Sequence, residues 1–335
     1  MRNEDNLLEY LKDKKIFIIS DSDLDGISAN IIARYYLQPI VQNFNFNITS
    51  DRNFATINYD YINQNDIIIF IDTSPNFEFY NILKNDYKKD IIIIDHHKTS
   101  FDIYNEKIDN FYWDLNQCGS ELFYNLLTKH IRSKRIISQY ISLVSTYDLW
   151  KDDSLLWKDA KNLNSILYEY VNWKDKNRND NNQFDTFIFN QLYKFNNYKH
   201  FFITKDEQSK AENAARKEKE NLSQARRSLK IRKDSQNNLY LYFECDSKLS
   251  YIASTLLKEY EEKNIKYCIG RSLYAFNQKK ELHLSIRSLD EKKFDCEYAA
   301  KLYQGGGHTR AAAINFTNKN EKNYFDLISG KKHLI

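Results

Sequence analysis

The chain has 335 residues, with 49 Lys and Arg against 46 Asp and Glu, so its formal net charge is only +3. This length suits two domains with sizeable cores, and the balanced charge excludes an overall basic field of the kind that attracts nucleic acid. Any phosphate-binding surface must therefore be local. The four cysteines form no Cys-x-x-Cys pair, which argues against a zinc ribbon or a disulfide framework and predicts reduced core residues.

The N-terminal stretch 1–15 is charged and polar and lacks the apolar core of a signal peptide. No later apolar run approaches the roughly 20 residues that a membrane-spanning helix needs. We therefore expect a cytoplasmic protein without a membrane partner. No feature of the sequence implies an obligate protein partner, and homodimerisation stays open.

Three carboxylates alternate along the segment Asp21-Ser22-Asp23-Leu24-Asp25-Gly26. The apolar run 16–19 before it predicts a strand buried on both faces of a parallel sheet, and a helix is expected over 27–37. Like charges a few ångströms apart raise one another's pKa, and a divalent metal ion among them is the simplest remedy. The alternative is a solvated, Asp-rich turn at the start of a helix.

Two further buried strands end in titratable residues. The apolar run 67–71 is followed by Asp72, and the run 91–94 leads directly into Asp95-His96-His97. With an alternating strand over 44–49, the pattern predicts an α/β fold with a doubly wound, mostly parallel sheet. Such sheets bind ligands at the carboxyl ends of their strands, so three acidic strand ends in succession favour one site over chance.

Helical spacing predicts a helix over 119–127 with Ser120 as its N-cap, and another over 136–144 that ends shortly before Asp148. By itself, an aspartate at a helix end beside aromatic residues is usually structural. Further amphipathic helices are expected over these ranges: 77–83, 163–170 and 187–193.

The stretch 205–233 is dense in charged residues, Gln and Ala and has no Gly or Pro, which predicts one long solvated connector helix. A smaller α/β domain follows. Its expected strands cover 239–243, 265–269 and 282–286, and its expected helices 249–260 and 297–303. The predicted organisation is a catalytic domain over 1–200, a connector over 201–233 and a substrate-binding domain over 234–335.

Within the last domain, Arg287 ends a strand, and the run Gly305-Gly306-Gly307-His308-Thr309-Arg310 follows a helix. Glycines let backbone amides approach an anion closely, and arginine clamps phosphate oxygens. The alternative for the glycine run is a helix C-cap followed by a flexible turn.

The candidate ligands at the sheet edge outnumber what one metal ion needs, and they suit two ions that share a carboxylate. Two divalent ions about 3.5–4 Å apart stabilise both the attacking and the leaving oxygen of a displacement at phosphorus. Oxygen ligands with an imidazole favour Mn²⁺, with Mg²⁺ or Co²⁺ as alternatives. The candidates are Asp21, Asp23, Asp25, Asp72, His96, His97 and Asp148.

In their order along the chain, these motifs resemble the DHH phosphoesterase superfamily with its DHH-associated C-terminal domain, and most closely the nanoRNase B type of oligoribonuclease. The resemblance implies that His97 and Asp95 are catalytic and that His97 faces the scissile phosphate. One departure is Asp21, since the nanoRNase B type usually has His there and RecJ-type nucleases have Asp. The implied ligands are Asp21 and Asp23 for one Mn²⁺, Asp72 as the bridge, and Asp25, His96 and Asp148 for the other.

The resemblance further implies a phosphodiesterase that hydrolyses short oligoribonucleotides (nanoRNA) to nucleoside monophosphates with water activated by two metal ions. Arg287, His308, Arg310 and the glycine run would hold the terminal phosphate of the substrate. Long nucleic acid would need additional binding surface. The alternatives are hydrolysis of 3′-phosphoadenosine-5′-phosphate, of a cyclic or linear dinucleotide or of pyrophosphate, a RecJ-like single-strand DNA exonuclease, and a catalytically silent nucleotide-binding regulator.

Overall fold

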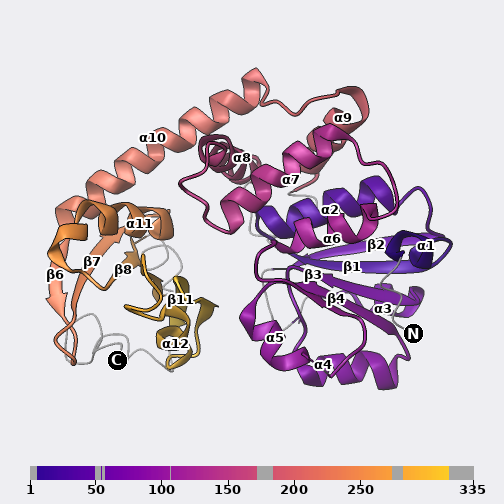
Figure 1. Cartoon of the computed structure of the whole chain (residues 1–335), viewed down its shortest axis with the longest axis horizontal. Helices are drawn as coiled ribbons and strands as arrows, with labels where there is room; N and C mark the ends of the chain where they lie inside the picture. Colours follow the sequence, from indigo (N-terminus) through magenta and orange to yellow (C-terminus); the bar gives the residue numbers. More distant parts are fainter. Residues whose placement is uncertain are drawn as a thin grey trace. The chain divides into compact units, whose positions relative to one another are not determined.

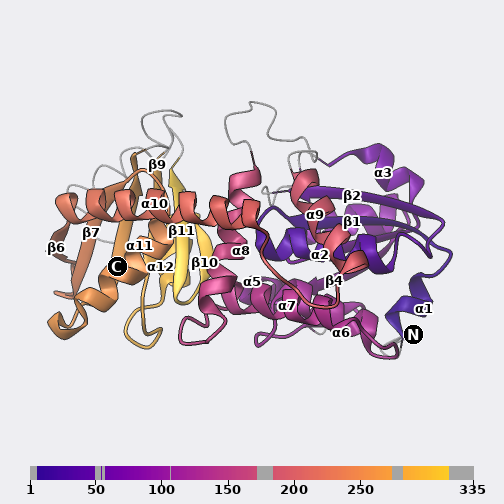
Figure 2. The same cartoon turned by 90° about the horizontal axis from the view of Figure 1, so that it is seen from above.

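The computed structural model (Figure 1) describes residues 6–49, 54, 57–105, 107–171, 184–273 and 282–316. The chain forms two compact units, Met1–Glu212 and Asn213–Ile335. The long helix α10 (Lys205–Ser228), seen from above in Figure 2, contributes residues to both units. The α/β fold class with a parallel sheet and a second sheet is confirmed. No helix within the described ranges is long and apolar enough to cross a membrane.

The first unit contains a sheet of five parallel strands in the order β2-β1-β3-β4-β5. The chain passes from β1 outwards to β2 and then returns to the other side of β1 to form β3. This reversal makes the ends of β1 and β3 the topological switch point, where doubly wound sheets bind their ligands. The strands are β1 (Lys15–Asp21), β2 (Asn43–Thr49), β3 (Ile67–Ile71), β4 (Asp90–Asp95) and β5 (Phe111–Trp113).

The central strands are apolar at nearly every position because both faces of this sheet are covered. In β1, Ile16 and Ile18 pack into one core, whereas Phe17 and Ile19 pack into the other. Figure 1 shows α2 and α6 on one face and α4 and α5 on the opposite face. The helices of this unit are α1 (Leu7–Leu11), α2 (Leu24–Tyr36), α3 (Tyr59–Gln64), α4 (Phe77–Asn81), α5 (Lys98–Tyr104), α6 (Gly119–Thr128), α7 (Arg135–Asp148), α8 (Trp157–Tyr170) and α9 (Asp185–Asn197), with a π-helical turn at Ile82–Asp86.

The start of α2 and the N-cap of α6 differ from the sequence predictions, and the acidic segment explains both. Helix α2 begins three residues early because the Asp23 carboxylate caps it by accepting the Gly26 N–H. Helix α6 has Cys118 rather than Ser120 at its N-cap position. The Asp25 carboxylate accepts the N–H groups of Gly119 and Ser120, so it supplies the cap from another helix.

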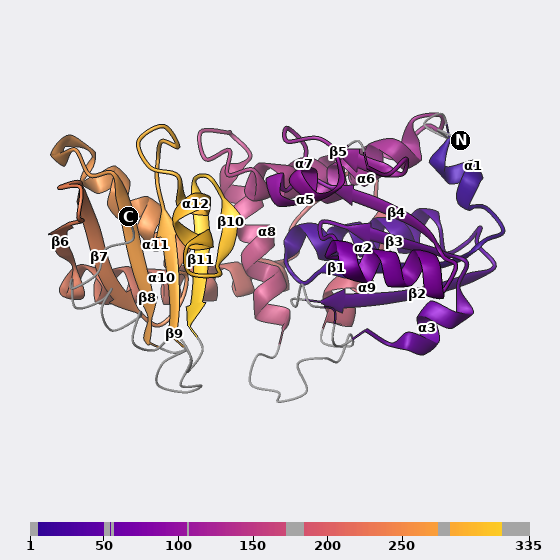
Figure 3. The same cartoon turned by 90° about the horizontal axis from the view of Figure 1, so that it is seen from below.

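The second unit contains a mixed sheet of six strands in the order β10-β11-β9-β8-β7-β6, which Figure 3 shows side by side. Helix α11 (Leu249–Glu259) packs against one face together with Ala225 of α10, and α12 (Cys296–Lys301) packs against the other. A short 3₁₀ turn covers Glu261–Lys263. The strands are β6 (Lys230–Lys233), β7 (Leu239–Cys245), β8 (Tyr267–Ser272), β9 (Leu282–Arg287), β10 (Gly306–His308) and β11 (Ala311–Phe316).

The expected helix over 205–233 is therefore wrong at its end. Helix α10 stops at Ser228, and Lys230–Lys233 pair with β7 as an antiparallel edge strand. The high charge of this strand is typical of a sheet edge, where lysine and arginine discourage pairing with another chain. All four cysteines, Cys118, Cys245, Cys268 and Cys296, are buried and free, as the sequence predicted.

A buried ion pair joins α9 to the start of α10. Lys194 Nζ lies 2.7 and 2.6 Å from the two carboxylate oxygens of Glu207, and the two side chains are 3% and 2% exposed. Glu207 also accepts the Thr204 N–H at 2.8 Å, while its own N–H donates to Thr204 Oγ1. This reciprocal pair of bonds is a capping box that begins α10.

We expect Glu207→Gln to lower the free energy of unfolding by about 3–5 kcal/mol, because it leaves the Lys194 ammonium buried without a counter-charge. Glutamine can still accept the Thr204 N–H and so keeps the capping box. The loss in free energy of unfolding therefore measures the contribution of the ion pair. Adding Lys194→Met should restore most of the stability. Urea unfolding of the three proteins measures this, and a double variant as unstable as Glu207→Gln would contradict the explanation.

Candidate metal centre

The acidic segment lies at the switch point of the first sheet. Asp21 is the last residue of β1, Asp23 caps α2, and Asp25 lies in the first turn of α2. The buried Asp25 carboxylate accepts the Gly119 N–H at 2.6 Å and the Ser120 N–H at 2.9 Å. The negative charge is thereby placed at the positive end of α6, where the helix dipole stabilises it.

Asp72 follows β3 directly and has a backbone φ of +58°, in the left-handed region that side chains other than glycine rarely adopt. Its carboxylate is buried. The N-terminus of α6 packs against it: a Cβ atom on Gly119 would lie only 2.8 Å from the Asp72 Cβ. Glycine at position 119 therefore permits the close approach of α6 to the acidic edge of the sheet.

Asp95 arranges the two histidines after β4. Its Oδ1 accepts the N–H groups of His96 and His97 at 2.7 and 3.2 Å and lies 2.7 Å from His97 Nδ1. Its Oδ2 accepts the hydroxyl of Ser100. Burial opposes ionisation of Asp95, but the His97 charge and these bonds outweigh it and hold the Asp95 pKa below its usual range. Asp95 thus stays ionised beneath the imidazoles.

Candidate ligands from three elements meet at His96. Its Nε2 lies 3.3 Å from Asp72 Oδ1 and 3.4 Å from Oδ2 of Asp148, the last residue of α7. Neighbouring ligands of an octahedral ion with bonds of roughly 2.1 Å lie about 3 Å apart, close to these separations. Two groups place one ligand atom from each residue within 4.8 Å of the others: Asp72, Asp95, His96 and His97, and Asp25, His96 and Asp148.

Asp21 and Asp23 contribute charge beside these groups. The Asp21 side chain accepts the N–H of Ser22, and its charge raises the pKa values of Asp72 and Asp148. Burial and the nearby Asp25 raise the pKa of Asp23 above its usual range. Asp21 and Asp23 therefore lie beside these two ligand groups but belong to neither, whereas Asp25, Asp72, His96, His97 and Asp148 each contribute a ligand atom.

Crowded negative charge shifts several pKa values at this site. Burial, and then Asp25 and Asp23, raise the pKa of Asp72 well above its usual range. Burial also raises the Asp148 pKa to about 8, although His96 opposes the shift. Burial alone would lower the His96 pKa, but the surrounding carboxylates raise it.

Two buried carboxylate oxygens, Asp72 Oδ2 and Asp148 Oδ2, have no hydrogen-bond partner among the described residues. Buried polar atoms are normally paired, and crowded carboxylates normally have a counter-charge. A divalent cation would satisfy both conditions, so the residues present fit a metal site with mixed oxygen and imidazole ligands.

Sequence reasoning missed three parts of this site. The Ser100 bond to Asp95 and the contact of Gly119 with Asp72 had no local pattern that would indicate them. Trp157 stacks on Tyr147, with ring centroids 5.7 Å apart, and contacts Trp150 edge-on at 5.1 Å, so an aromatic cluster flanks Asp148. The only sequence signal for the last was the dense run of aromatics on either side of Asp148.

In the second unit, Arg287 and His308 lie in one row across three strands. Arg287 of β9 is paired with Ala311 of β11, which is paired in turn with His308 of β10. Directly opposed residues project from the same face of a sheet, so the small Ala311 side chain separates the two larger ones. The exposed Arg310 lies in the turn between β10 and β11, and its carbonyl accepts the Ser288 N–H.

The glycine run is neither a simple helix cap nor a flexible turn. Gly305 precedes β10, and Gly306–His308 form that strand against β11. Gly307 has a φ of +143°, and a Cβ there would lie 2.4 Å from the Ala311 carbonyl oxygen. The structural requirement for glycine at position 307 is therefore close strand pairing.

We expect the free energy of unfolding of metal-free Asp148→Asn to fall less as pH rises than that of the metal-free wild type. The Asp148 carboxyl has an ordinary pKa of 3.8 and a pKa of about 8 in the folded protein. Between these values the folded state binds more protons than the unfolded state, so the free energy of unfolding falls with rising pH. Urea unfolding in EDTA at three pH values from about 5 to 8 measures the effect. The exposed Asp153→Asn should follow the wild type, and parallel curves for wild type and Asp148→Asn would refute the assignment.

Residues 15–146 match the model of the DHH family, N-terminal domain. No curated protein sequence matches the chain. Among solved structures, a DHH domain of a member of the s1p family of ribosomal proteins is similar with a TM-score of 0.62 and 13% identity, covering 97% of this chain and 87% of that one. RecJ from Thermus thermophilus, in complex with Mn²⁺, has a TM-score of 0.54 and 14% identity, covering 95% of this chain and 52% of its own. Both likenesses concern the fold, and residues 15–146 are similar to the DHH family N-terminal domain.

Proposed function

We propose that this protein is a phosphodiesterase that uses two divalent metal ions, Mn²⁺ by preference, to hydrolyse short oligoribonucleotides to nucleoside monophosphates. The observation that carries the proposal is the meeting of Asp72, His96 and Asp148. Their ligand atoms lie 3.3 and 3.4 Å apart, and two of the buried carboxylate oxygens make no hydrogen bond within the described residues. The DHH family match supports it. The Mn²⁺ in the similar RecJ structure supports the choice of metal.

When bound, divalent ions would supply positive charge to the phosphate oxygens and lower the pKa of water. We assign the ligands by the order of the family's motifs. Asp25 remains available in this role although it caps α6, because each carboxylate oxygen has a second lone pair. Asp21 and Asp23 would hold one ion, Asp25, His96 and Asp148 would hold the other, and Asp72 would contribute to both.

His97 is assigned to the scissile phosphate. Its Nδ1 lies 2.7 Å from the ionised Asp95, which makes Nδ1 the protonated nitrogen and directs the chemistry of the ring to Nε2. From there His97 would donate a hydrogen bond to a phosphate oxygen or transfer a proton to the leaving group. Asp95 acts through the histidines and is a positioning residue in this assignment.

The second unit would bind the terminal phosphate of the substrate. Arg287 offers a planar set of donors suited to phosphate oxygens, and His308 lies in the same row on the same sheet face. Arg310 and the amides of Gly306 and Gly307 complete the assignment, since the Gly305 N–H already donates to the Ala300 carbonyl at 2.9 Å. A substrate held by its terminal phosphate has a defined end, and this favours short oligoribonucleotides. The aromatic cluster beside Asp148 offers surfaces on which bases can stack.

We expect Mn²⁺-dependent hydrolysis of a labelled RNA dimer and pentamer, and we expect EDTA to abolish it. Asp72→Ala should lower kcat by at least about 10³-fold, because it removes the carboxylate assigned to both ions. Chromatography of the products measures nucleoside monophosphate release. Parallel assays with 3′-phosphoadenosine-5′-phosphate, a cyclic dinucleotide, pyrophosphate and single-stranded DNA distinguish the alternative substrates.

The control for Asp72→Ala is the exposed Asp153→Ala, which should retain wild-type activity. Hydrolysis that persists after chelation would refute the metal-dependent mechanism. Tight nucleotide binding by the wild type without turnover of any substrate would instead support a silent regulator.

We expect Arg287→Gln to raise KM for an RNA dimer carrying a terminal phosphate by about ten-fold and to leave KM for the unphosphorylated dimer nearly unchanged, because one charge-assisted contact to phosphate is lost. The shift of melting temperature on Mn²⁺ addition should stay at its wild-type size. The exposed Arg227→Gln in the same unit is the matched control. Equal effects on both dimers would exclude a role for Arg287 at the terminal phosphate.

A further inference from the structure

A second concave surface of the first unit is strongly basic. It is a pocket of about 680 Å³ between the start of α7 and the segment after α9. Within the described residues, no acidic side chain lines it. This local excess contrasts with the near balance of charge in the whole chain, 49 basic against 46 acidic residues. The basic residues of the pocket are Arg132, Lys134, Arg135, Lys199 and His200, and we call them the basic face.

Three of these cations have no acidic partner among the residues that the structure describes. All the residues of the basic face are exposed, and none of the ion pairs in the described part of the chain involves Arg132, Arg135 or Lys199. Lys134 is different, because its Nζ donates to the Phe195 carbonyl at 3.1 Å and helps to hold α7 against α9. The unneutralised charge is thus concentrated at Arg132, Arg135 and Lys199.

The start of α7 adds to this positive charge. Lys134 occupies the N-cap position and makes no side-chain capping bond, Arg135 is the first helical residue, and the first turn contains no acidic residue. The free N–H groups of a helix N-terminus carry partial positive charge, so basic residues there are locally unfavourable and an anion is favourable. A helix start that has basic residues in place of the usual acidic and capping side chains is suited to binding an anion.

Exposed aromatic rings continue the basic face. Tyr198 lines the same pocket and is 44% exposed, and it contacts Tyr193 and Phe202, which are 51% and 38% exposed. The ring centroids of Tyr198 lie 6.2 Å from Tyr193 and 4.8 Å from Phe202, both in edge-to-face arrangements. We call these three residues the aromatic row.

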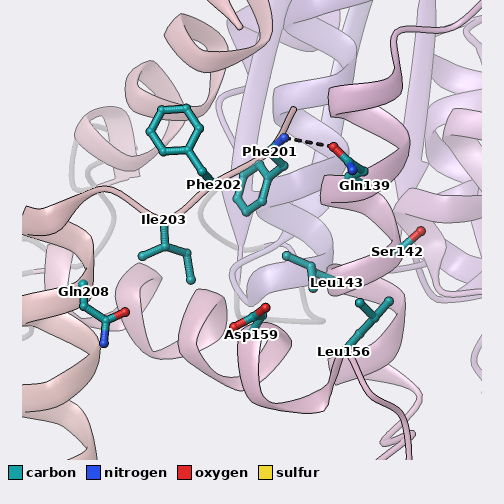
Figure 4. A pocket seen from close by; sticks show the side chains of 9 residues that line it. All are labelled: Gln139, Ser142, Leu143, Leu156, Asp159, Phe201, Phe202, Ile203 and Gln208. Atoms are coloured by element: carbon teal, nitrogen blue, oxygen red, sulfur yellow. Dashed lines mark hydrogen bonds between the residues drawn. The ribbon is translucent and has the colours of Figure 1, made fainter. Parts of the chain in front are cut away.

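The segment that carries the aromatic row is anchored. The Phe201 N–H donates to Gln139 Oε1 of α7 at 3.0 Å, and Phe202 and Ile203 leave the segment on opposite sides (Figure 4). Phe201, Phe202 and Ile203 line a separate pocket of about 390 Å³ next to α7 and α8. The rings of the aromatic row are therefore presented from a fixed backbone.

We propose that the basic face and the aromatic row together form a binding surface for single-stranded nucleic acid, separate from the metal centre. Basic residues that follow a sugar–phosphate backbone, beside aromatic rings on which bases stack, are the combination that single-strand binding needs. Duplex nucleic acid fits less well, because its bases are not available for stacking on the rings. An anionic membrane is disfavoured because the surface is concave, whereas membrane-binding helices insert a protruding apolar face.

Only strands longer than the shortest substrates can contact this surface and the metal centre at the same time. Arg135 begins α7 and Asp148 ends it, so the two ends of this helix lie roughly 20 Å apart at about 1.5 Å per residue. With bases spaced about 3.4 Å apart along a stacked strand, a strand must have about six or more nucleotides to reach both. A dinucleotide at the metal centre cannot reach the basic face.

The test measures binding of a fluorescein-labelled 12-nucleotide single-stranded RNA by anisotropy in EDTA, at several salt concentrations, so that hydrolysis does not contribute. We expect Arg132→Gln/Arg135→Gln/Lys199→Gln to weaken binding at least ten-fold near 0.15 M salt. The slope of log K against log salt should fall by about two, since each phosphate contact on a single strand contributes about 0.7. Circular dichroism melting verifies that the variant is folded.

The matched control, Lys14→Gln/Lys88→Gln/Lys107→Gln, removes the same net charge from three other exposed sites of the first unit. It should retain nearly wild-type affinity and salt slope. Tyr198→Ala should weaken binding about ten-fold, through loss of one stacked base, whereas Tyr59→Ala, a ring of similar exposure on α3, should not.

The proposal is overturned if both triple variants lose affinity equally, which would indicate a net-charge effect, or if the variant of the basic face binds RNA like the wild type. Binding to phosphatidylserine vesicles that depends on the basic face, without RNA binding, would identify a membrane surface instead. Hydrolysis of an RNA dimer should be unchanged in the basic-face variant. The outcome therefore does not depend on whether the metal centre hydrolyses RNA.

Discussion

Repulsion among buried carboxylates at one sheet edge is the constraint on which the rest of this structure depends. Asp23, Asp72 and Asp148 all have raised pKa values because burial and their acidic neighbours penalise the charged form. A fold tolerates such an arrangement only when the surrounding structure imposes it or a cation relieves it. Here the parallel strands impose it, since their carboxyl ends meet at the switch point between β1 and β3.

The surrounding elements hold this edge in place mainly through α6. Its first N–H groups bind the Asp25 carboxylate, and its first residue, Gly119, lets the helix contact Asp72. Asp95 performs the same task for the histidines, because its carboxylate binds the backbone after β4 as well as the His97 ring. Two aspartates thus position the acidic site through hydrogen bonds to the backbone, and the candidate ligands gain fixed positions without flexible loops.

Recognition of a phosphorylated substrate would use surfaces that differ in kind from the metal centre. The row of Arg287, Ala311 and His308 is built on strands of the second unit, where register decides which side chains share a face. The basic face and the aromatic row are built on helix ends and an anchored segment of the first unit, where charge is exposed and unneutralised. The metal centre itself is buried and acidic. The small net charge of the chain therefore conceals a strong local segregation of charge.

The sequence alone determined the α/β class, the strands that deliver Asp21, Asp72 and His96, and the ordered motifs that resemble the DHH family, because apolar runs and their polar ends are local patterns. Tertiary structure decided what depends on distant segments. Asp148 joins the site only because α7 packs so that its last turn reaches His96, and Gly119 and Ser100 gain their roles only by packing against Asp72 and Asp95. The cap of α6 by Asp25 and the strand that follows α10 after Ser228 were likewise mispredicted, since each depends on a partner outside the helix itself.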